Sequence, residues 1–98
     1  MKIKTKSGFE CNVNERRLKD WRYVKAAAKL SSNNESEIVE ALTFAVPFLL
    51  GEDGEAELMK HVEDEEGVVD SEKMVAEYIE VTQIAGEKVK KSQSSLSS

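Results

Sequence analysis

The side chains with most potential for chemistry in this 98-residue chain are its single cysteine, Cys11, and its single histidine, His61. A reactive cysteine needs a base or a positive charge beside it, and a zinc site needs several Cys or His ligands at fixed spacing. Cys11 lies in a predicted strand with no histidine near it in the sequence, and His61 has no partner ligand of this kind. The sequence therefore predicts no catalytic residue, no metal site and no cofactor site.

The acidic run 63–70 is the second candidate for chemistry, because carboxylates bind calcium in helix–loop–helix sites. Aligning Gly67 with the obligatory loop glycine puts Val62 at the first ligand position and Lys73 at the position of the bidentate glutamate. Neither side chain binds calcium, so the run is predicted to be an acidic turn between helices. Carboxylates elsewhere lie on charged faces, where nothing desolvates one of them for acid–base catalysis. We therefore expect a protein that is not an enzyme.

Charge is distributed unevenly along the chain, which has a net charge of −5. Residues 1–30 hold nine Lys or Arg and three acids, whereas residues 51–72 hold ten acids and one lysine. This asymmetry favours head-to-tail self-association or a bipolar surface for partners, with ordinary solvated faces as the alternative. A phosphate-binding domain carries an overall basic excess, so no nucleic-acid partner is expected. No apolar block follows the first lysines, and we expect neither a signal peptide nor a membrane span.

The residues that open the chain predict a β-hairpin over about 2–13. Apolar and polar residues alternate on both sides of Ser7-Gly8, and the glycine accepts the positive φ angle of a tight turn. We interpret the lysine-rich outer strand as an edge guarded against pairing, with strand addition by a partner as the alternative.

The remainder of the chain predicts a mainly α-helical fold, a small bundle of about four helices behind the hairpin. Together they form one domain over 1–91, followed by a polar, low-complexity tail at 92–98 that is predicted to be disordered. The predicted helices cover about 15–30, 34–50, 54–65 and 71–90.

The helix at 34–50 is apolar around most of its circumference, which predicts a buried core helix. Asn34 is placed to cap its first turn, and Gly51 to end it. Pro47 removes a backbone donor, so we expect a kink or an early end there. The residues after it either bend into the core or form an exposed apolar lip at Phe48.

The helix at 15–30 carries two apolar stripes on nearly opposite sides. The stronger one includes Trp21 and is expected to pack on the central helix; the weaker one includes Tyr23. The alternative is that the face around Trp21 and Tyr23, together with the lip at Phe48, binds a partner. Trp21, Tyr23 and Phe48 are therefore the predicted partner-binding residues, chosen by physical argument and not by a motif.

The order of these segments resembles a known family. A hairpin, KIKTKSGFECNVNE, leads into LKDWRYVKAAAKL, then into an apolar helix ending LLGEDG, and then into ELMKHVEDEEGVVDSEKMVAEYIEV and a polar tail. SGFECNVNE, DWR and EDEEGVVDSEKM are the most telling phrases. Over residues 1–90 the chain resembles the small tail assembly chaperones of long-tailed phages and prophages of Gram-positive bacteria.

The resemblance implies a non-enzymatic helper that binds the tape measure protein while the tail tube assembles around it, with the major tail protein as a second partner. It also implies a place in the cytoplasm of the bacterial host and absence from the mature virion. The alternative hypothesis is an acidic phage or prophage regulatory or inhibitor protein. The acids of residues 51–72 would then imitate phosphates and bind a basic host protein.

Overall fold

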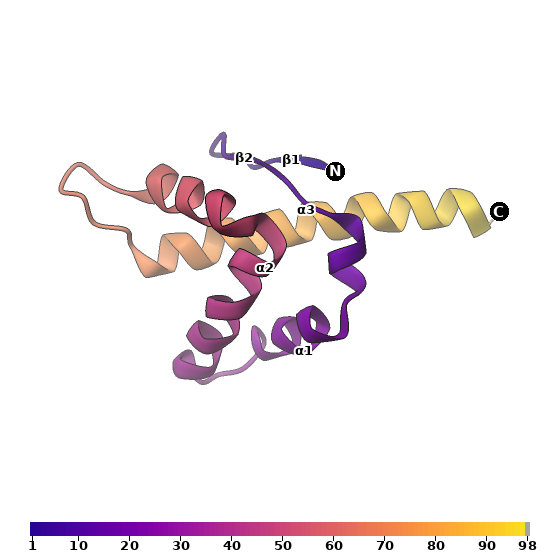
Figure 1. Ribbon diagram of the computed structural model, residues 1–98, viewed down its shortest axis with the longest axis horizontal. Helices are drawn as coiled ribbons and strands as arrows, with labels where there is room; N and C mark the ends of the chain where they lie inside the picture. The colour runs from indigo at the N-terminus through magenta and orange to yellow at the C-terminus, as the bar shows by residue number, and fades with distance from the viewer. Residues whose placement is uncertain (98) are drawn as a thin grey trace.

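A hairpin, a short 3-10 helix and three α-helices follow one another along the chain (Figure 1). The computed structural model describes residues 1–97, with side chains described up to Lys90. The mainly helical class and the N-terminal hairpin are confirmed. The prediction of about four helices is wrong, because the segments predicted as separate helices at 34–50 and 54–65 form one element, α2. The elements are β1 (Lys2–Lys4), β2 (Glu10–Asn12), η1 (Glu15–Lys19), α1 (Trp21–Lys29), α2 (Glu35–Val62) and α3 (Ser71–Ser97).

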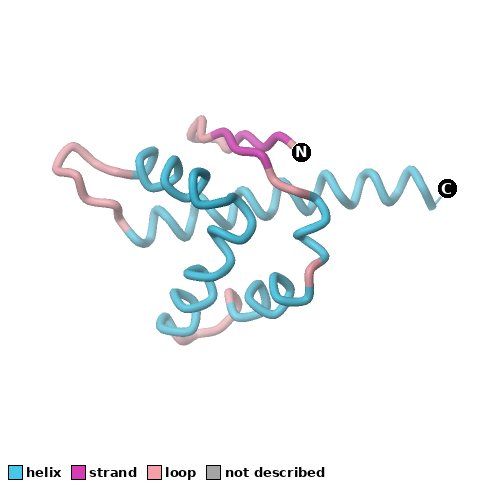
Figure 2. Tube along the Cα trace, viewed as in Figure 1, coloured by secondary structure: helices cyan, strands magenta, loops and turns pink. Residues whose placement is uncertain are grey.

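The long helix α3 sets the shape of the molecule, whose dimensions are 51, 29 and 21 Å. Figure 2 shows α3 along the longest axis, with its C-terminal end extending beyond the other elements. The predicted tail, 92–98, lies beyond the last described side chain. Its disorder and the domain limits of 1–91 therefore stay predictions.

The hairpin has the predicted turn and alternation. Ile3 pairs with Cys11 in antiparallel register, and Gly8 takes a φ of 99° in the turn. The alternate side chains of both strands enter the core. The outer edge contacts α3, where Lys88 Nζ donates to the Lys2 carbonyl at 2.6 Å and the Lys6 amide donates to Glu80 at 2.6 Å. These contacts favour the guarded-edge interpretation. The buried hairpin residues are Ile3, Thr5, Phe9 and Val13.

Helix α2 changes direction at Gly51, whose φ of 81° and ψ of 163° are the only non-helical angles within it. Gly54 sits so close to the preceding turn that an added Cβ would lie 2.8 Å from Leu50 Cβ. The kink or early end expected at Pro47 is misplaced, since the backbone angles stay helical through Pro47 to Leu50 and the break lies at Gly51. A proline removes one helical hydrogen bond, and Thr43, the residue whose carbonyl loses its donor, is exposed to water.

The largest fully buried side chains come from the hairpin, the second half of α2 and α3; they are Tyr78, Ile3, Leu58, Val13 and Val81. The first half of α2 is buried on one face only. Ala45 and Leu49 are enclosed, whereas Val39 is 57% exposed and Phe44 39% exposed. The prediction of a central helix buried all round is therefore wrong. Its neighbours cover one side of it and leave apolar surface on the other.

Candidate partner-binding surface

The position of α1 is set by two capped helix starts in succession. Asn14 accepts a hydrogen bond from the Arg16 amide at 3.0 Å, and Asp20 accepts one from the Arg22 amide at 2.8 Å. Asp20 also binds the Arg22 guanidinium through two further hydrogen bonds of 3.1 and 3.0 Å. The Arg22 side chain and amide hold the pKa of the Asp20 carboxyl below its ordinary value. The helix thus begins at Trp21, directly after its capping residue.

The larger apolar stripe of α1 faces solvent. Trp21 is 70% exposed and Val24 44% exposed, and Ala28 on the next turn is exposed as well. We call Trp21, Val24 and Ala28 the exposed stripe; their spacing of three and four residues puts them on one helix face. The prediction that this stripe packs on the central helix is wrong.

The opposite stripe of α1 faces the core. Tyr23 is 8% exposed and Ala26 is equally enclosed. Ala26 and Ala41 line the same groove between α1 and α2, where two small side chains let the helices approach closely. A tryptophan at this interface would hold the helices apart. The side of α1 that carries Ala26 therefore packs against α2, and the side that carries the larger Trp21 does not.

Tyr23 consequently does not share a surface with Trp21. Its phenol lies near that of Tyr78 in the core, and burial raises the pKa of both hydroxyls. The Tyr78 hydroxyl has no hydrogen bond of acceptable geometry among the described residues. Of the three predicted partner-binding residues, Tyr23 belongs to the core of the protomer.

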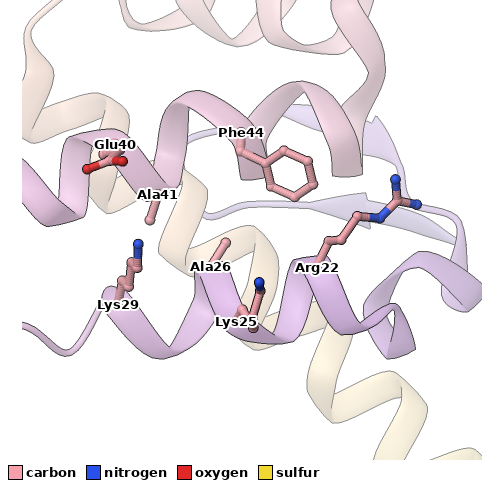
Figure 3. A pocket seen from close by; sticks show the side chains of 7 residues that line it. All are labelled: Arg22, Lys25, Ala26, Lys29, Glu40, Ala41 and Phe44. Atoms are coloured by element: carbon pink, nitrogen blue, oxygen red, sulfur yellow. The ribbon is translucent and has the colours of Figure 1, made fainter.

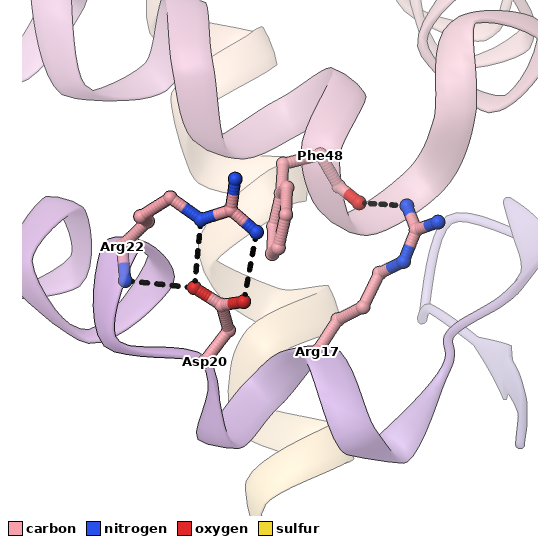
Figure 4. A network of polar contacts seen from close by, with 4 residues as sticks. All are labelled: Arg17, Asp20, Arg22 and Phe48. Atoms are coloured by element: carbon pink, nitrogen blue, oxygen red, sulfur yellow. Dashed lines mark hydrogen bonds and ion pairs between the residues drawn. The ribbon is translucent and has the colours of Figure 1, made fainter.

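Phe48 is half-buried beneath two guanidinium groups (Figure 4). The Cζ atoms of Arg17 and Arg22 lie 5.3 and 5.2 Å from its ring centroid. The Phe44 ring is stacked on it at 5.1 Å. Each cation lies within the range of an attractive contact with an aromatic face. The predicted lip exists in part: Phe44, which the sequence did not nominate, carries the exposed edge and Phe48 supports it.

The backbone of Phe48 explains why Arg17 is there. The break at Gly51 ends the hydrogen-bond ladder of the first half of α2, so the last carbonyls of that half need other donors. Arg17 Nη1 donates to the Phe48 carbonyl at 2.6 Å. A cation at a helix C-terminus also interacts favourably with the helix dipole. Arg17 thereby joins η1 to α2.

A groove of about 360 Å³ runs between α1 and the first half of α2 (Figure 3). We call it the basic groove. Its α1 side carries three cations on successive turns, and its α2 side carries an apolar wall with one carboxylate. The spacing of these cations at 22, 25 and 29 is the sequence signal that they share one face of the helix. The lining residues are Arg22, Lys25, Ala26, Lys29, Glu40, Ala41 and Phe44.

A serine, a histidine and a glutamate meet at the hairpin turn, an arrangement the sequence did not predict. The Ser7 hydroxyl lies 2.9 Å from His61 Nε2 and also donates to Glu77 Oε1. A catalytic triad needs the acid on the other ring nitrogen of the histidine, where it orients the base. Here both groups contact the same hydroxyl. The cluster therefore attaches the hairpin turn to α2 and α3 and does not activate a nucleophile.

Comparison of the chain with protein-family models, curated proteins and solved structures finds no significant match. Among the described residues there is no cluster of three or more Asp, Glu, His or Cys side chains arranged to hold a metal ion. None of the helices, as far as they are described, is both long and apolar enough to cross a membrane. The surface of α1 and the basic groove are the two candidate binding surfaces.

Proposed function

We propose that this chain is a non-enzymatic tail assembly chaperone of the kind encoded by long-tailed phages and prophages, and that it holds the tape measure protein during tail tube assembly. The observation that carries the proposal is the exposed stripe on α1. A single tryptophan that is 70% exposed, on a helix whose other stripe already fills the core, is available for a partner. The segment resemblance over residues 1–90 supplies the identity of that partner.

The stripe suits a helical partner that must later be released. Its three residues span about 10 Å of helix, enough for two turns of a second helix to pack along it. One aromatic anchor with small neighbours gives a contact of modest affinity, since hot spots of binding are few and aromatic. Many weak copies along one long chain bind firmly together and detach one at a time.

The test is co-expression with the tape measure protein of the same phage or prophage, followed by measurement of soluble complex. Trp21→Ala together with Val24→Ser is expected to abolish solubilisation of the tape measure while leaving the chaperone folded. The matched control is Val68→Ser, which changes an apolar side chain that is 52% exposed on the acidic turn. Tape measure solubilised equally by the stripe variant would overturn the proposal.

A second candidate, an acidic inhibitor of a basic host protein, is favoured by one observation. The carboxylate side chains of Glu52, Asp53, Glu57 and 63–66 are exposed along the second half of α2 and the turn after it. Binding through them would weaken steeply as salt is raised, because exposed charges are screened. Binding through the exposed stripe would change little with salt, so a salt titration of the complex separates the two candidates.

A further inference from the structure

We propose that the basic groove is a docking site for a second copy of this chain, which inserts the acidic outer face of the second half of its α2. The contact joins two different surfaces, so each copy keeps one of them free and the assembly grows head to tail. This inference concerns the protein alone and does not depend on the proposed function.

The groove carries an excess of positive charge beside an apolar wall. Arg22 forms the one ion pair present among the described side chains, with Asp20 at 3.0 Å. Lys25 and Lys29 have no ion-pair partner in that part of the chain, and both project from α1 in Figure 3. Phe44, 39% exposed, forms the apolar wall opposite them. An occupant should therefore present apolar atoms at its centre and carboxylates at its margin.

The second half of α2 has this pattern on its outer face. Glu52, Ala56, Met59 and Glu63 are all exposed, with Met59 42% exposed, and we call them the acidic strip. The opposite face of the same helix is fixed in the core by Leu58, which is fully buried. The strip thus has an apolar centre with a carboxylate at each end. Glu52 and Glu63 are about 16 Å apart along the helix, whereas Arg22 and Lys29 are about 10 Å apart along α1, so the flexible cationic side chains of the groove have to extend outward to meet both carboxylates.

The two surfaces belong to different copies, because they lie apart within one protomer. Figure 1 shows α1 at one side of the molecule and the part of α2 after Gly51 on the other, beyond the first half of α2. A separation seen in projection is a lower limit on the true one. The turn at Gly51 produces this geometry by directing the acidic strip away from the groove that the first half of the same helix lines.

Glu40 allows a test in which a substitution is expected to strengthen the association. Its carboxylate lines the groove on the α2 side, where it would repel an acidic occupant. Glu40→Gln is therefore expected to strengthen the association, whereas neutralising Lys25 or Lys29 weakens it. A folding defect or a general change in solubility would not move these variants in opposite directions.

The experiment measures the mass of the purified full chain by analytical ultracentrifugation over a range of concentrations at low and high salt. We expect the mean mass to rise with concentration at low salt and the rise to be suppressed at high salt. Two variants, Lys25→Gln with Lys29→Gln and Glu52→Gln with Glu63→Gln, should each need about tenfold more protein to associate. A wild-type chain that stays monomeric at every concentration overturns the proposal.

Mixing the two variants gives the deciding result. The mixture contains one intact groove and one intact strip, so it should form one-to-one pairs that do not grow further. A mixture that behaves like each variant alone contradicts the assignment of the two surfaces. A wild-type dimer that stops at two copies contradicts head-to-tail growth, because a closed pair leaves neither surface free for a third copy.

Discussion

The two ends of this small domain are built differently. At one end the hairpin, the second half of α2 and α3 enclose Ile3, Leu58 and Val81 completely, and side chains of α3 bind the turn and edge of the hairpin. At the other end, α1 and the first half of α2 leave Trp21, Val39 and Phe44 in contact with water. We call these the closed end and the open end. From this difference we expect stability to reside mainly in the closed end, whereas the open end leaves more apolar surface in contact with water.

The largest expected effect is a contrast between two truncations in the same helix. Leu58→Ala, at the closed end, removes a fully buried side chain and should lower the free energy of unfolding by about 2–5 kcal/mol. Val39→Ala, at the open end, should change it by no more than about 0.5 kcal/mol. Chemical denaturation of both variants measures the contrast. Equal losses of unfolding free energy in the two variants would show that the closed end and the open end contribute similarly to stability.

The boundary between the ends is Gly51, whose φ of 81° and ψ of 163° belong to a region that only glycine occupies readily. Gly51→Ala should cost about 1–3 kcal/mol of stability. Gly86→Ala is the matched control, because an added Cβ there meets no atom within 4 Å and the site is helical. The control should stabilise the protein by up to about 1 kcal/mol. If Gly51→Ala left the stability unchanged, a glycine would not be required at the break in α2.

Both tyrosines of the chain belong to the core contact between α1 and α3, and burial raises the pKa of each above the ordinary value of 10.0. The unfolded chain therefore ionises first as the pH rises. Stability is complete below the unfolded pKa and falls as the pH is raised through it toward the folded pKa. Ultraviolet absorbance should show tyrosine ionisation coinciding with loss of helical circular dichroism. Ionisation near pH 10 with the helices intact would show that α1 packs less closely than described.

A smaller effect is expected where the open end is attached to the closed one. Arg17→Met removes the 2.6 Å hydrogen bond to the Phe48 carbonyl and one cation over the Phe48 ring. We expect a loss of about 1 kcal/mol in the free energy of unfolding. Arg16→Met, at an exposed neighbouring position, is the control and should be nearly neutral. Equal values for the two would show that Arg17 does not hold η1 against α2.

The sequence was sufficient where one local pattern had no competitor. Alternation around Gly8 predicted the hairpin, and Asn34 caps α2 through its side chain as expected. Gly51 is the residue predicted to end the central helix, and the helix does break there, although helical backbone angles resume immediately after it in a new direction. Each of these features is decided by two or three adjacent residues.

The sequence was insufficient where two patterns competed. Helix α1 has an apolar stripe on each side, and size favoured Trp21 while close packing of Ala26 beside Ala41 favoured the other. Only the tertiary arrangement decides between them. The basic groove is likewise formed by α2 crossing α1, so no local pattern predicts its far wall. Partner binding by Trp21, Tyr23 and Phe48 therefore stays a prediction, and the structure places one of the three, Tyr23, in the core.

The most direct test of the open end is the fluorescence of Trp21, the single tryptophan of the chain. With 70% of its side chain exposed, its emission maximum should stay nearly unchanged when the folded protein is unfolded, and acrylamide should quench it almost as well as free tryptophan. A strongly blue-shifted, poorly quenched emission in the folded monomer would show that Trp21 is buried. The exposed stripe, and the function proposed for it, would then be wrong.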